Sequence, residues 1–388
     1  MVLDNGKNIF KLSVLGMSLF IVLSLYNRAT WGASFSYVAI PSALLVLAGI
    51  SNKVYIRLES LYLIPFFLIY FFSTATSQYV EMKSDIITFA IFIVVLIITS
   101  SINFTNKELK IIIIVYLIVS LSGSINIIYN WFRHNYIQYW LQRSSFKFLG
   151  KFKDPNYVLA FSAPASILSV FVFLNTKKNK FMRIFSGLNF LLCAFSCLCA
   201  GTRAGMLSIL VSILLIIIIV KKITKRTKLK ILLIISICIL IGVLFILNFY
   251  NKYALERMFH DDDGSGRLEI WKSALSVFKN NPLFGGGFNS GSSVSLITNS
   301  FSTHSIFVDI LCDSGVLGLL FFIMYFITNC LKCRKDNIEF QLVLGCAFLI
   351  PMFFINGFNT TTLYFPLIIL SVFSSYCRKH NYLSLVRF

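Results

Sequence analysis

The sequence predicts an all-α, polytopic integral membrane protein with a single membrane domain over residues 1–388. Hydrophobic residues make up 57% of the chain and charged residues 13%, and its mean hydropathy is +0.81. Soluble domains contain about 25% charged residues. A helix needs roughly 20 apolar residues to cross the hydrocarbon core of a bilayer, and the chain contains about twelve runs of that kind. We therefore expect about twelve transmembrane helices.

The first run follows Lys7 and Lys11, as in a signal peptide, but no small-residue cleavage site comes after it. It is therefore expected to be an uncleaved span. The twelve predicted spans lie near residues 9–26, 33–50, 58–76, 84–102, 109–129, 155–174, 184–200, 204–220, 231–249, 304–329, 338–356 and 363–377.

The distribution of Lys and Arg predicts the orientation of these spans. Residues 175–183 contain four Lys or Arg and residues 221–230 contain six. Short cytoplasmic loops of membrane proteins accumulate such residues. With an even number of spans, both termini are expected to be cytoplasmic, and residues 129–154 and 250–303 are expected to lie outside. The net charge of +20 then reflects loop bias beside the lipid bilayer, and no nucleic-acid partner is expected.

The first outer loop, residues 129–154, is basic, with Asp154 as its one acid. Arg residues make bidentate bonds to phosphate, so this loop suits a phosphate or pyrophosphate group. Contact with anionic lipid headgroups is an equal alternative. Its aromatic residues suit either stacking on sugar rings or the aromatic belt at a membrane surface. The basic residues are Arg133, Arg143, Lys147, Lys151 and Lys153, and the aromatic residues include Trp131, Phe132, Tyr136, Tyr139 and Trp140.

Arg203 lies between two predicted spans in the sequence GTRAG, residues 201–205, with almost no loop around it. An Arg at that depth is costly unless it reaches the surface or finds a partner. The two flanking glycines permit close approach of the backbone to another group. Arg203 is therefore a candidate for the outer mouth of the bundle.

The second outer loop, residues 250–303, contains a predicted helix that begins near Arg267. Leu268, Trp271, Leu275 and Phe278 share one face of this helix, which predicts an interfacial helix. Free N–H groups at its start favour anions near Arg267. Asn281 and Pro282 end the helix, and a glycine turn follows at residues 285–287. The acid triplet at residues 261–263 lacks the terminal Glu of a calcium loop, so no metal is expected there.

His304 opens the next span, with Asp309 and Asp313 further along it. The two acids are four residues apart and share a helix face. Ionisable residues in a membrane segment are functional candidates. An imidazole at neutral pH is suited to act as a general base.

Five motifs occur in a fixed order along residues 150–318. They are GKFKDPN at 150–156, GTRAG at 201–205, GRLEIW at 266–271, NPLFGGGF at 281–288, and His304 followed by DSGVLG at 313–318. In this order the chain resembles the O-antigen polymerase and O-antigen ligase superfamily over roughly residues 140–330.

The resemblance implies a type C glycosyltransferase-like fold and an inverting, metal-independent glycosyltransferase without a cofactor. Its donor and acceptor would be undecaprenyl-pyrophosphate-linked glycans, and its active site would face the periplasm from the bacterial inner membrane. Arg203 and Arg267 would bind pyrophosphate, and His304 would complete the catalytic set. Ser305 stands where the family usually has Asn, so His304 is open to three roles: general base, sugar ligand or helix cap. The residues expected to contact substrate are Arg133, Arg143, Lys151, Lys153, Asp154, Asn156 and Trp271.

The resemblance does not separate a polymerase from a ligase, which transfers the glycan to the lipid A core. The bias toward Lys, 23 against 12 Arg, resembles polymerases encoded in O-antigen gene clusters and favours that activity. A flippase or other transporter of lipid-linked oligosaccharides is the alternative from another class. A protein that regulates chain length is a further candidate partner.

Overall fold

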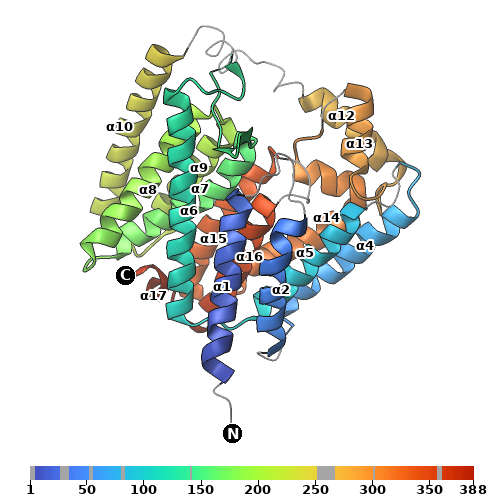
Figure 1. Ribbon diagram of the computed structural model, residues 1–388, viewed down its shortest axis with the longest axis horizontal. Helices are drawn as coiled ribbons and strands as arrows, with labels where there is room; N and C mark the ends of the chain where they lie inside the picture. Colours follow the sequence, from blue (N-terminus) through green and yellow to red (C-terminus); the bar gives the residue numbers. More distant parts are fainter. Residues whose placement is uncertain are drawn as a thin grey trace.

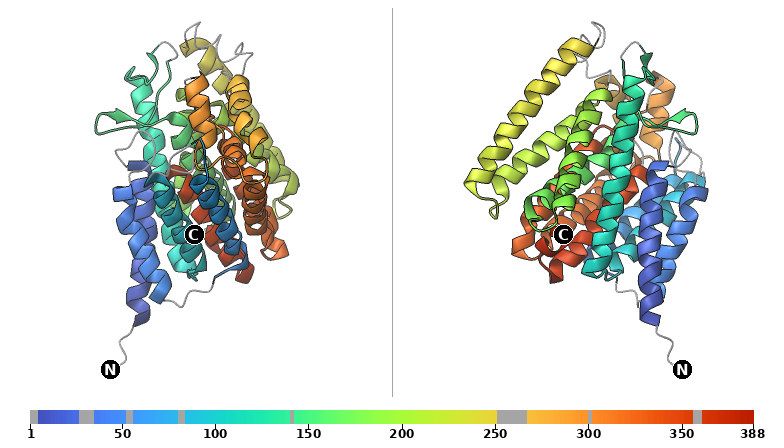
Figure 2. Two further views of the ribbon diagram at one scale, coloured as in Figure 1. Left: turned by 90° about the vertical axis from the view of Figure 1, so that its right-hand side faces the viewer. Right: turned by 60° about the vertical axis from the view of Figure 1, so that its left-hand side comes forward.

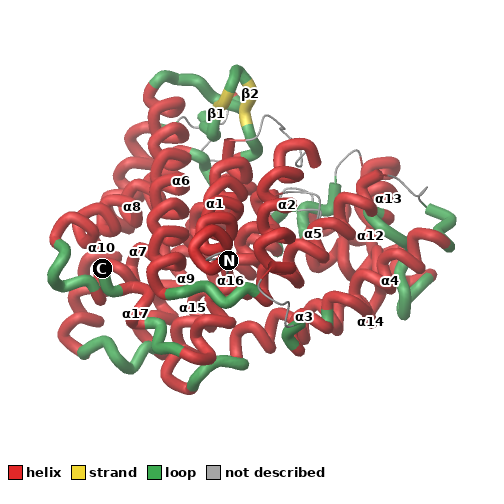
Figure 3. The backbone as a smooth tube through the Cα atoms, turned by 60° about the horizontal axis from the view of Figure 1, so that its bottom comes forward, coloured by secondary structure: helices red, strands yellow, loops and turns green. Residues whose placement is uncertain are grey.

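The computed structural model describes residues 5–26, 35–51, 56–79, 84–139, 142–250, 267–299, 302–355 and 361–388. Within these residues the protein is a bundle of helices with one small β-hairpin (Figure 1, Figure 3). The acid triplet at residues 261–263, Trp140 and the residue before Arg267 lie outside the described residues.

Every one of the twelve predicted spans corresponds to a helix, and the third is broken into two pieces at Tyr62. The helices are α1 (Asn5–Tyr26), α2 (Phe35–Ser51), α3 (Leu58–Leu61) with α4 (Leu63–Ala75), α5 (Ser84–Ser101), α6 (Asn106–Phe132), α7 (Pro155–Asn175), α8 (Lys180–Cys199), α9 (Arg203–Ile219), α10 (Lys225–Phe249), α14 (Ile306–Leu331), α15 (Lys335–Met352) and α16 (Thr361–Lys379).

Six helical segments among the described residues are long and apolar enough to cross a membrane, and four shorter apolar helices accompany them. The six are Leu58–Ala75, Asn106–Phe132, Pro155–Asn175, Lys180–Cys199, Lys225–Phe249 and Ile306–Leu331. The protein is thus an all-α, polytopic membrane protein, as the sequence predicts. α10 lies at the edge of the bundle, with 11% of its apolar window buried (Figure 2).

The two outer loops of the sequence form structure at one end of the bundle, which we call the hairpin end. The first contributes β1 (Lys147–Phe148) and β2 (Lys151–Phe152), which pair antiparallel. The second contributes α12 (Arg267–Asn280) and α13 (Ser290–Asn299). Figure 1 shows these elements at the top and both chain termini away from them.

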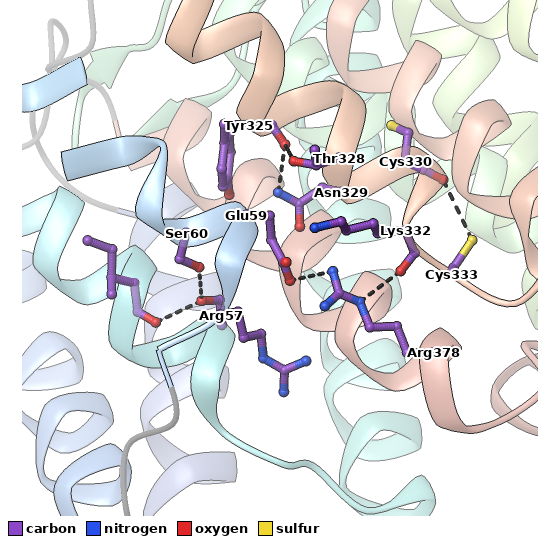
Figure 4. Close-up of polar contacts among 12 residues, drawn as sticks. Arg57, Glu59, Ser60, Tyr325, Thr328, Asn329, Cys330, Lys332, Cys333 and Arg378 are labelled. Carbon is purple, nitrogen blue, oxygen red and sulfur yellow. Dashed lines mark hydrogen bonds and ion pairs between the residues drawn. The ribbon is translucent and has the colours of Figure 1, made fainter. Parts of the chain in front are cut away.

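The C-terminal residues close the opposite end of the bundle, which we call the terminal end. α17 (Leu383–Val386) packs beside α6 and α7. Lys110 Nζ donates to the Arg387 carbonyl at 2.5 Å, and Thr176 Oγ1 donates to the Val386 carbonyl at 2.9 Å. An ion pair of 2.5 Å joins the buried Glu59 of α3 to Arg378 of α16 at this end (Figure 4).

The glycine turn predicted at residues 285–287 interlocks with a kink in α14. Gly315 has φ 64 inside that helix, and Gly285 has φ 74. A Cβ added to Gly285 would lie 2.4 Å from the backbone carbon of Asp313, and one added to Gly315 would lie 2.3 Å from the Leu283 carbonyl oxygen. Only glycine combines this backbone conformation with so close an approach. The turn and the kink therefore fix each other.

α4 supports the same turn from the other side. The Ser73 and Ser77 hydroxyls donate to the carbonyls of Phe284 and Gly286. The Phe288 N–H donates to Thr74 Oγ1 at 2.7 Å. The segment between α12 and α13 is consequently bound to both α4 and α14. Because this segment directly follows α12, it also fixes the position of the end of α12.

The structure confirms the predicted helix after residue 266 and shows which of its residues pack on the bundle. Ile270, Ala274 and Val277 are buried, whereas Leu268 is 60% exposed. α12 packs on α13 and α14, and the small Ala274 permits close contact with Cys312, whose thiol lies 3.2 Å from the Ala274 carbonyl. The face of closest approach is thus chosen by small side chains rather than by the largest apolar ones.

Candidate functional site

Arg143 connects three segments at the hairpin end. It is bridged to Gln138 within the loop that precedes β1. Its Nε donates to the Ala200 carbonyl at 3.0 Å, and its Nη2 donates to Asn156 Oδ1 at 3.2 Å. Arg143 therefore joins the basic loop to the turn between α8 and α9 and to the first turn of α7.

The start of α7 is built around Asp154, which is the N-cap of this helix. Its side chain accepts a bond of 2.7 Å from the Asn156 N–H, and Pro155 follows as the first helical residue. Asp at the N-cap and Pro at the first position both favour a helix start. The motif at residues 150–156 thus places Asp154 and Asn156 beside Arg143.

Arg203 is the first residue of α9 and its side chain is exposed. Gly201, with φ 58, turns the chain from α8 into α9, and a Cβ at Gly201 would lie 3.7 Å from Arg143 Cγ. Arg203 is therefore two residues beyond Gly201, the residue of this turn that lies near Arg143.

Arg267 begins α12, across from that turn at the same end of the bundle (Figure 1). Its guanidinium carbon lies 5.2 Å from the centroid of the Phe354 ring, in a cation–π geometry. The ring supports the planar guanidinium group on one side. A guanidinium group matches the bidentate geometry of phosphate and carboxylate anions.

His304 lies between α13 and α14 with φ 51, in the left-handed region. Burial is the main cause that lowers its pKa below the ordinary value, and the charges of Arg267 and Arg143 lower it further, while Asp154 opposes them. These charges come from three separate segments of the chain. The imidazole therefore belongs to the same group as Arg143, Asp154 and Arg267, and it favours the neutral form that accepts a proton.

His304 does not occupy the cap position of the following helix. α14 begins at Ile306, and its N-cap is Ser305. Of the three roles left open by the sequence, the helix cap is therefore wrong. A general base and a sugar ligand remain.

Trp271 is hydrogen-bonded to Thr303, the residue before His304. The indole Nε1 donates to the Thr303 carbonyl at 2.8 Å. The polar edge of Trp271 thus holds the residue before His304, and a contact of Trp271 with substrate stays a prediction.

Three of the predicted substrate-binding residues lie elsewhere at this end. Arg133 at the end of α6 and Lys151 on β2 are exposed. Lys153 is buried, and its Nζ donates to the Ser24 carbonyl of α1 at 2.9 Å. Burial lowers the pKa of Lys153 to about 7. Lys153 therefore points toward α1, and its role in binding substrate stays a prediction, as do those of Arg133 and Lys151.

The structure separates the aromatic residues of the first outer loop into two sets. Trp131 is buried and packs on Phe245 and Tyr250 of the α10 region, with ring centroids 4.9 and 6.1 Å away. Tyr136 and Tyr139 pack edge to face at 5.8 Å, and Tyr139 is 72% exposed. Trp131 is thus part of the bundle, whereas the tyrosine pair remains a candidate for stacking on sugars.

The two acids of α14 have structural partners that the sequence did not indicate. Asp313 accepts bonds from the Asn289 and Gly291 N–H groups at 2.8 and 3.2 Å and from Ser290 Oγ at 3.1 Å. Asp309 accepts from Thr303 Oγ1 at 2.5 Å and from Ser292 Oγ at 3.0 Å. The spacing of four residues predicted a shared face, but no sequence pattern pointed to Thr303 or Ser292.

The surroundings of His304 predict opposite effects of two substitutions on its pKa. Asp154→Asn removes the charge that raises this pKa, so the pKa should fall further, while Asn still caps α7. Arg143→Gln removes a charge that lowers it, so the pKa should rise. NMR titration of the imidazole, assigned with a His304→Ala variant, measures both. Shifts in the same direction would contradict the arrangement of charges described above.

Comparison with known families gives one match. Residues 188–323 match the family model described as O-antigen ligase. That segment is about a third of the chain and contains Arg203, Arg267 and His304. No curated protein matches this chain.

Proposed function

Since the chain belongs to the O-antigen polymerase and ligase superfamily, we propose that it is an O-antigen polymerase, an inverting, metal-independent glycosyltransferase. It joins oligosaccharide repeat units that are linked to undecaprenyl pyrophosphate. The grouping of His304 with Arg267, Arg143 and Asp154 is the observation that most supports this proposal. The group combines a proton acceptor with fixed cations at one end of a membrane bundle.

In the proposed reaction a hydroxyl of the acceptor unit attacks the anomeric carbon of the growing chain. The bond from that carbon to the pyrophosphate oxygen breaks as the new glycosidic bond forms on the opposite face of the sugar, which inverts the configuration. His304 takes the proton of the attacking hydroxyl. The pyrophosphate leaves with its undecaprenyl carrier.

Arg203 and Arg267 stabilise the leaving group, because negative charge builds up on the pyrophosphate oxygen in the transition state. Cations that are already in place at that point lower the barrier. Arg267 is supported by the Phe354 ring, and Arg203 projects from the first turn of α9. Guanidinium groups match the bidentate geometry of phosphate oxygens.

Arg143 of the basic loop is bonded to Asn156 in the first turn of α7. Arg143 is partly occupied by its bonds to Ala200 and Asn156, so its main contribution is to hold the turn before Arg203 in place. The pair of Tyr136 and the exposed Tyr139 lies on the same loop as Arg143, where an acceptor sugar can stack.

We place the hairpin end in the periplasm of a bacterium and the protein in its inner membrane. The connections at residues 175–183 and 221–230 are rich in Lys and Arg, and these belong on the cytoplasmic side. An active site at the outer surface of the bundle is accessible to a lipid-anchored pyrophosphate. The glycan of such a donor extends into the periplasm.

Two other functions make different predictions. A ligase shares the catalytic group but uses lipid A core as its acceptor. A flippase concentrates its charged residues inside the spans, around a central cavity. The grouping of Arg143, Arg267 and His304 at one end of the bundle favours an enzyme over a flippase.

Deletion of the gene distinguishes these functions. The polymerase proposal predicts lipopolysaccharide capped with a single repeat unit and no long-chain ladder on a gel. Loss of a ligase would leave bare core together with unattached lipid-linked polymer. Survival of the full ladder in the deletion strain would contradict the proposal.

A further inference from the structure

Asp309 is buried beneath the segment that carries His304. It lies in the first turn of α14 and is 1% exposed. Its Oδ1 accepts a bond of 2.5 Å from Thr303 Oγ1 and one of 3.0 Å from Ser292 Oγ of α13. The carboxylate therefore ties both α13 and the residue before His304 to α14.

Thr303 is held at two points from opposite elements. Its hydroxyl is bound by Asp309 of α14, and its carbonyl accepts the indole N–H of Trp271 from α12 at 2.8 Å. The side chain of Thr303 is fully buried. Rotation of Thr303 about its backbone would break at least one of these bonds.

The residue after His304 is held by the same group. The Ser305 N–H points at Thr303 Oγ1 at 3.5 Å, and the Ser305 carbonyl accepts the Asp309 N–H at 2.9 Å. His304 is thus flanked on both sides by residues that depend on Asp309 and on the Thr303 hydroxyl.

His304 itself adopts φ 51, a conformation that residues other than glycine keep only where their surroundings impose it. The two fixed neighbours supply that constraint. The direction of the imidazole relative to Asp154, Arg267 and Arg143, the charged groups that act on it, follows from the backbone at this residue.

We propose that Asp309 is a positioning residue, which fixes the orientation of the His304 imidazole through the Thr303 hydroxyl. The inference rests on the proposed function, in which His304 receives the proton of the acceptor hydroxyl. Asp309 touches neither substrate in this scheme. Asp313, one turn further along α14, holds residues 289–291 instead and so serves the glycine turn.

The experiment compares Thr303→Val, Thr303→Ser, Asp309→Leu and the Thr303→Val/Asp309→Leu double variant. The substrate is undecaprenyl-pyrophosphate-linked repeat unit extracted from the producing strain lacking this gene. Val keeps the shape of Thr and loses its hydroxyl, whereas Ser keeps the hydroxyl. A small error in the placement of a catalytic group costs up to about 100-fold in rate.

We expect Thr303→Val and Asp309→Leu each to lower kcat by about 10- to 100-fold, with the KM for the lipid-linked unit unchanged. Thr303→Ser should retain the wild-type kcat. The double variant should be no slower than the slower single variant, because both changes remove the same hydrogen bond, the one between Thr303 and residue 309. Independent losses that multiply in the double variant would overturn the inference.

Two matched controls carry the same substitutions away from the site. Thr328→Val changes a threonine of α14 that bonds to the Met324 carbonyl of its own helix, and Asp336→Leu changes an exposed acid at the start of α15. Both should keep wild-type kcat. If Asp309→Leu does not fold, the Thr303 pair decides: equal kcat for Val and Ser overturns the inference.

A His304→Ala variant separates this inference from the proposed function. An inactive His304→Ala beside a fully active Thr303→Val would overturn the positioning role alone. A His304→Ala variant with wild-type kcat would overturn the role of His304 as the base, and with it the proposed mechanism.

Discussion

Replacing Arg203 or Arg267 with alanine should abolish chain extension while the protein still inserts and folds. The expected loss in kcat is about 10²- to 10³-fold for each residue, the effect of removing one fixed donor from a developing negative charge. Both residues lie at helix starts at the hairpin end, with Arg267 stacked over Phe354. The substitutions therefore remove charge from the site and leave the spans intact.

Lysine at the same positions should restore only part of the activity. It keeps the charge but cannot make the bidentate bonds of a guanidinium. Arg226→Ala, in the exposed first turn of α10 at the terminal end, is the matched control and should keep full activity. Turnover is measured as extension of lipid-linked units by purified protein. Full activity of both alanine variants at Arg203 and Arg267 would remove them from the mechanism.

Replacing His304 with alanine should lower kcat by about 10²- to 10⁴-fold, the range expected for loss of a general base. The structure supports this role because burial lowers the pKa of His304, so the neutral imidazole is available at neutral pH. Activity should be lost as the pH falls through this lowered pKa, since the protonated ring cannot accept a proton. The acidic limb of the kcat profile should thus lie below the ordinary pKa of histidine.

His304→Asn and His304→Gln distinguish a base from a sugar ligand. Both keep hydrogen-bonding groups but cannot take up a proton near neutral pH. If His304 is the base, neither variant recovers activity. Recovery of most of the wild-type kcat by either variant would show that His304 binds sugar and that another group receives the proton.

The spans were predictable from the sequence because lipid imposes a simple requirement. Each of twelve apolar runs forms a helix, and even the third, which breaks at Tyr62, keeps its predicted extent. Two helix ends were predicted as well: α7 begins at Pro155, where the sixth span was expected to start, and α12 ends at Asn280, directly before Asn281 and Pro282. In these cases the residues of a single segment determine where its helix begins and ends.

Features that depend on two distant segments were not predictable. The Ser-rich sequence of α13 reads as a loop, yet it forms a helix because Asp313 and Asp309 of α14 bind its first residues. The kink at Gly315 exists because Leu283 approaches it, and no local pattern encodes that contact.

The candidate site was predictable in its members and not in its geometry. Motif order singled out Arg203, Arg267 and His304, and the structure brings His304 together with Arg267, Arg143 and Asp154. The basic loop, by contrast, contains two lysines that the sequence does not distinguish but that differ in burial in the structure. Lys153 is buried against α1, whereas Lys151 is exposed.

The central claim is that this protein joins one lipid-linked unit to another. Purified protein, in lipid vesicles with only undecaprenyl-pyrophosphate-linked repeat units, tests it directly. The products are separated by size after release from the carrier. We expect a ladder of oligomers still attached to the carrier, formed without lipid A core and absent with the Arg267→Ala variant. Transfer that occurs only when lipid A core is added, with no oligomers on the carrier, would contradict it.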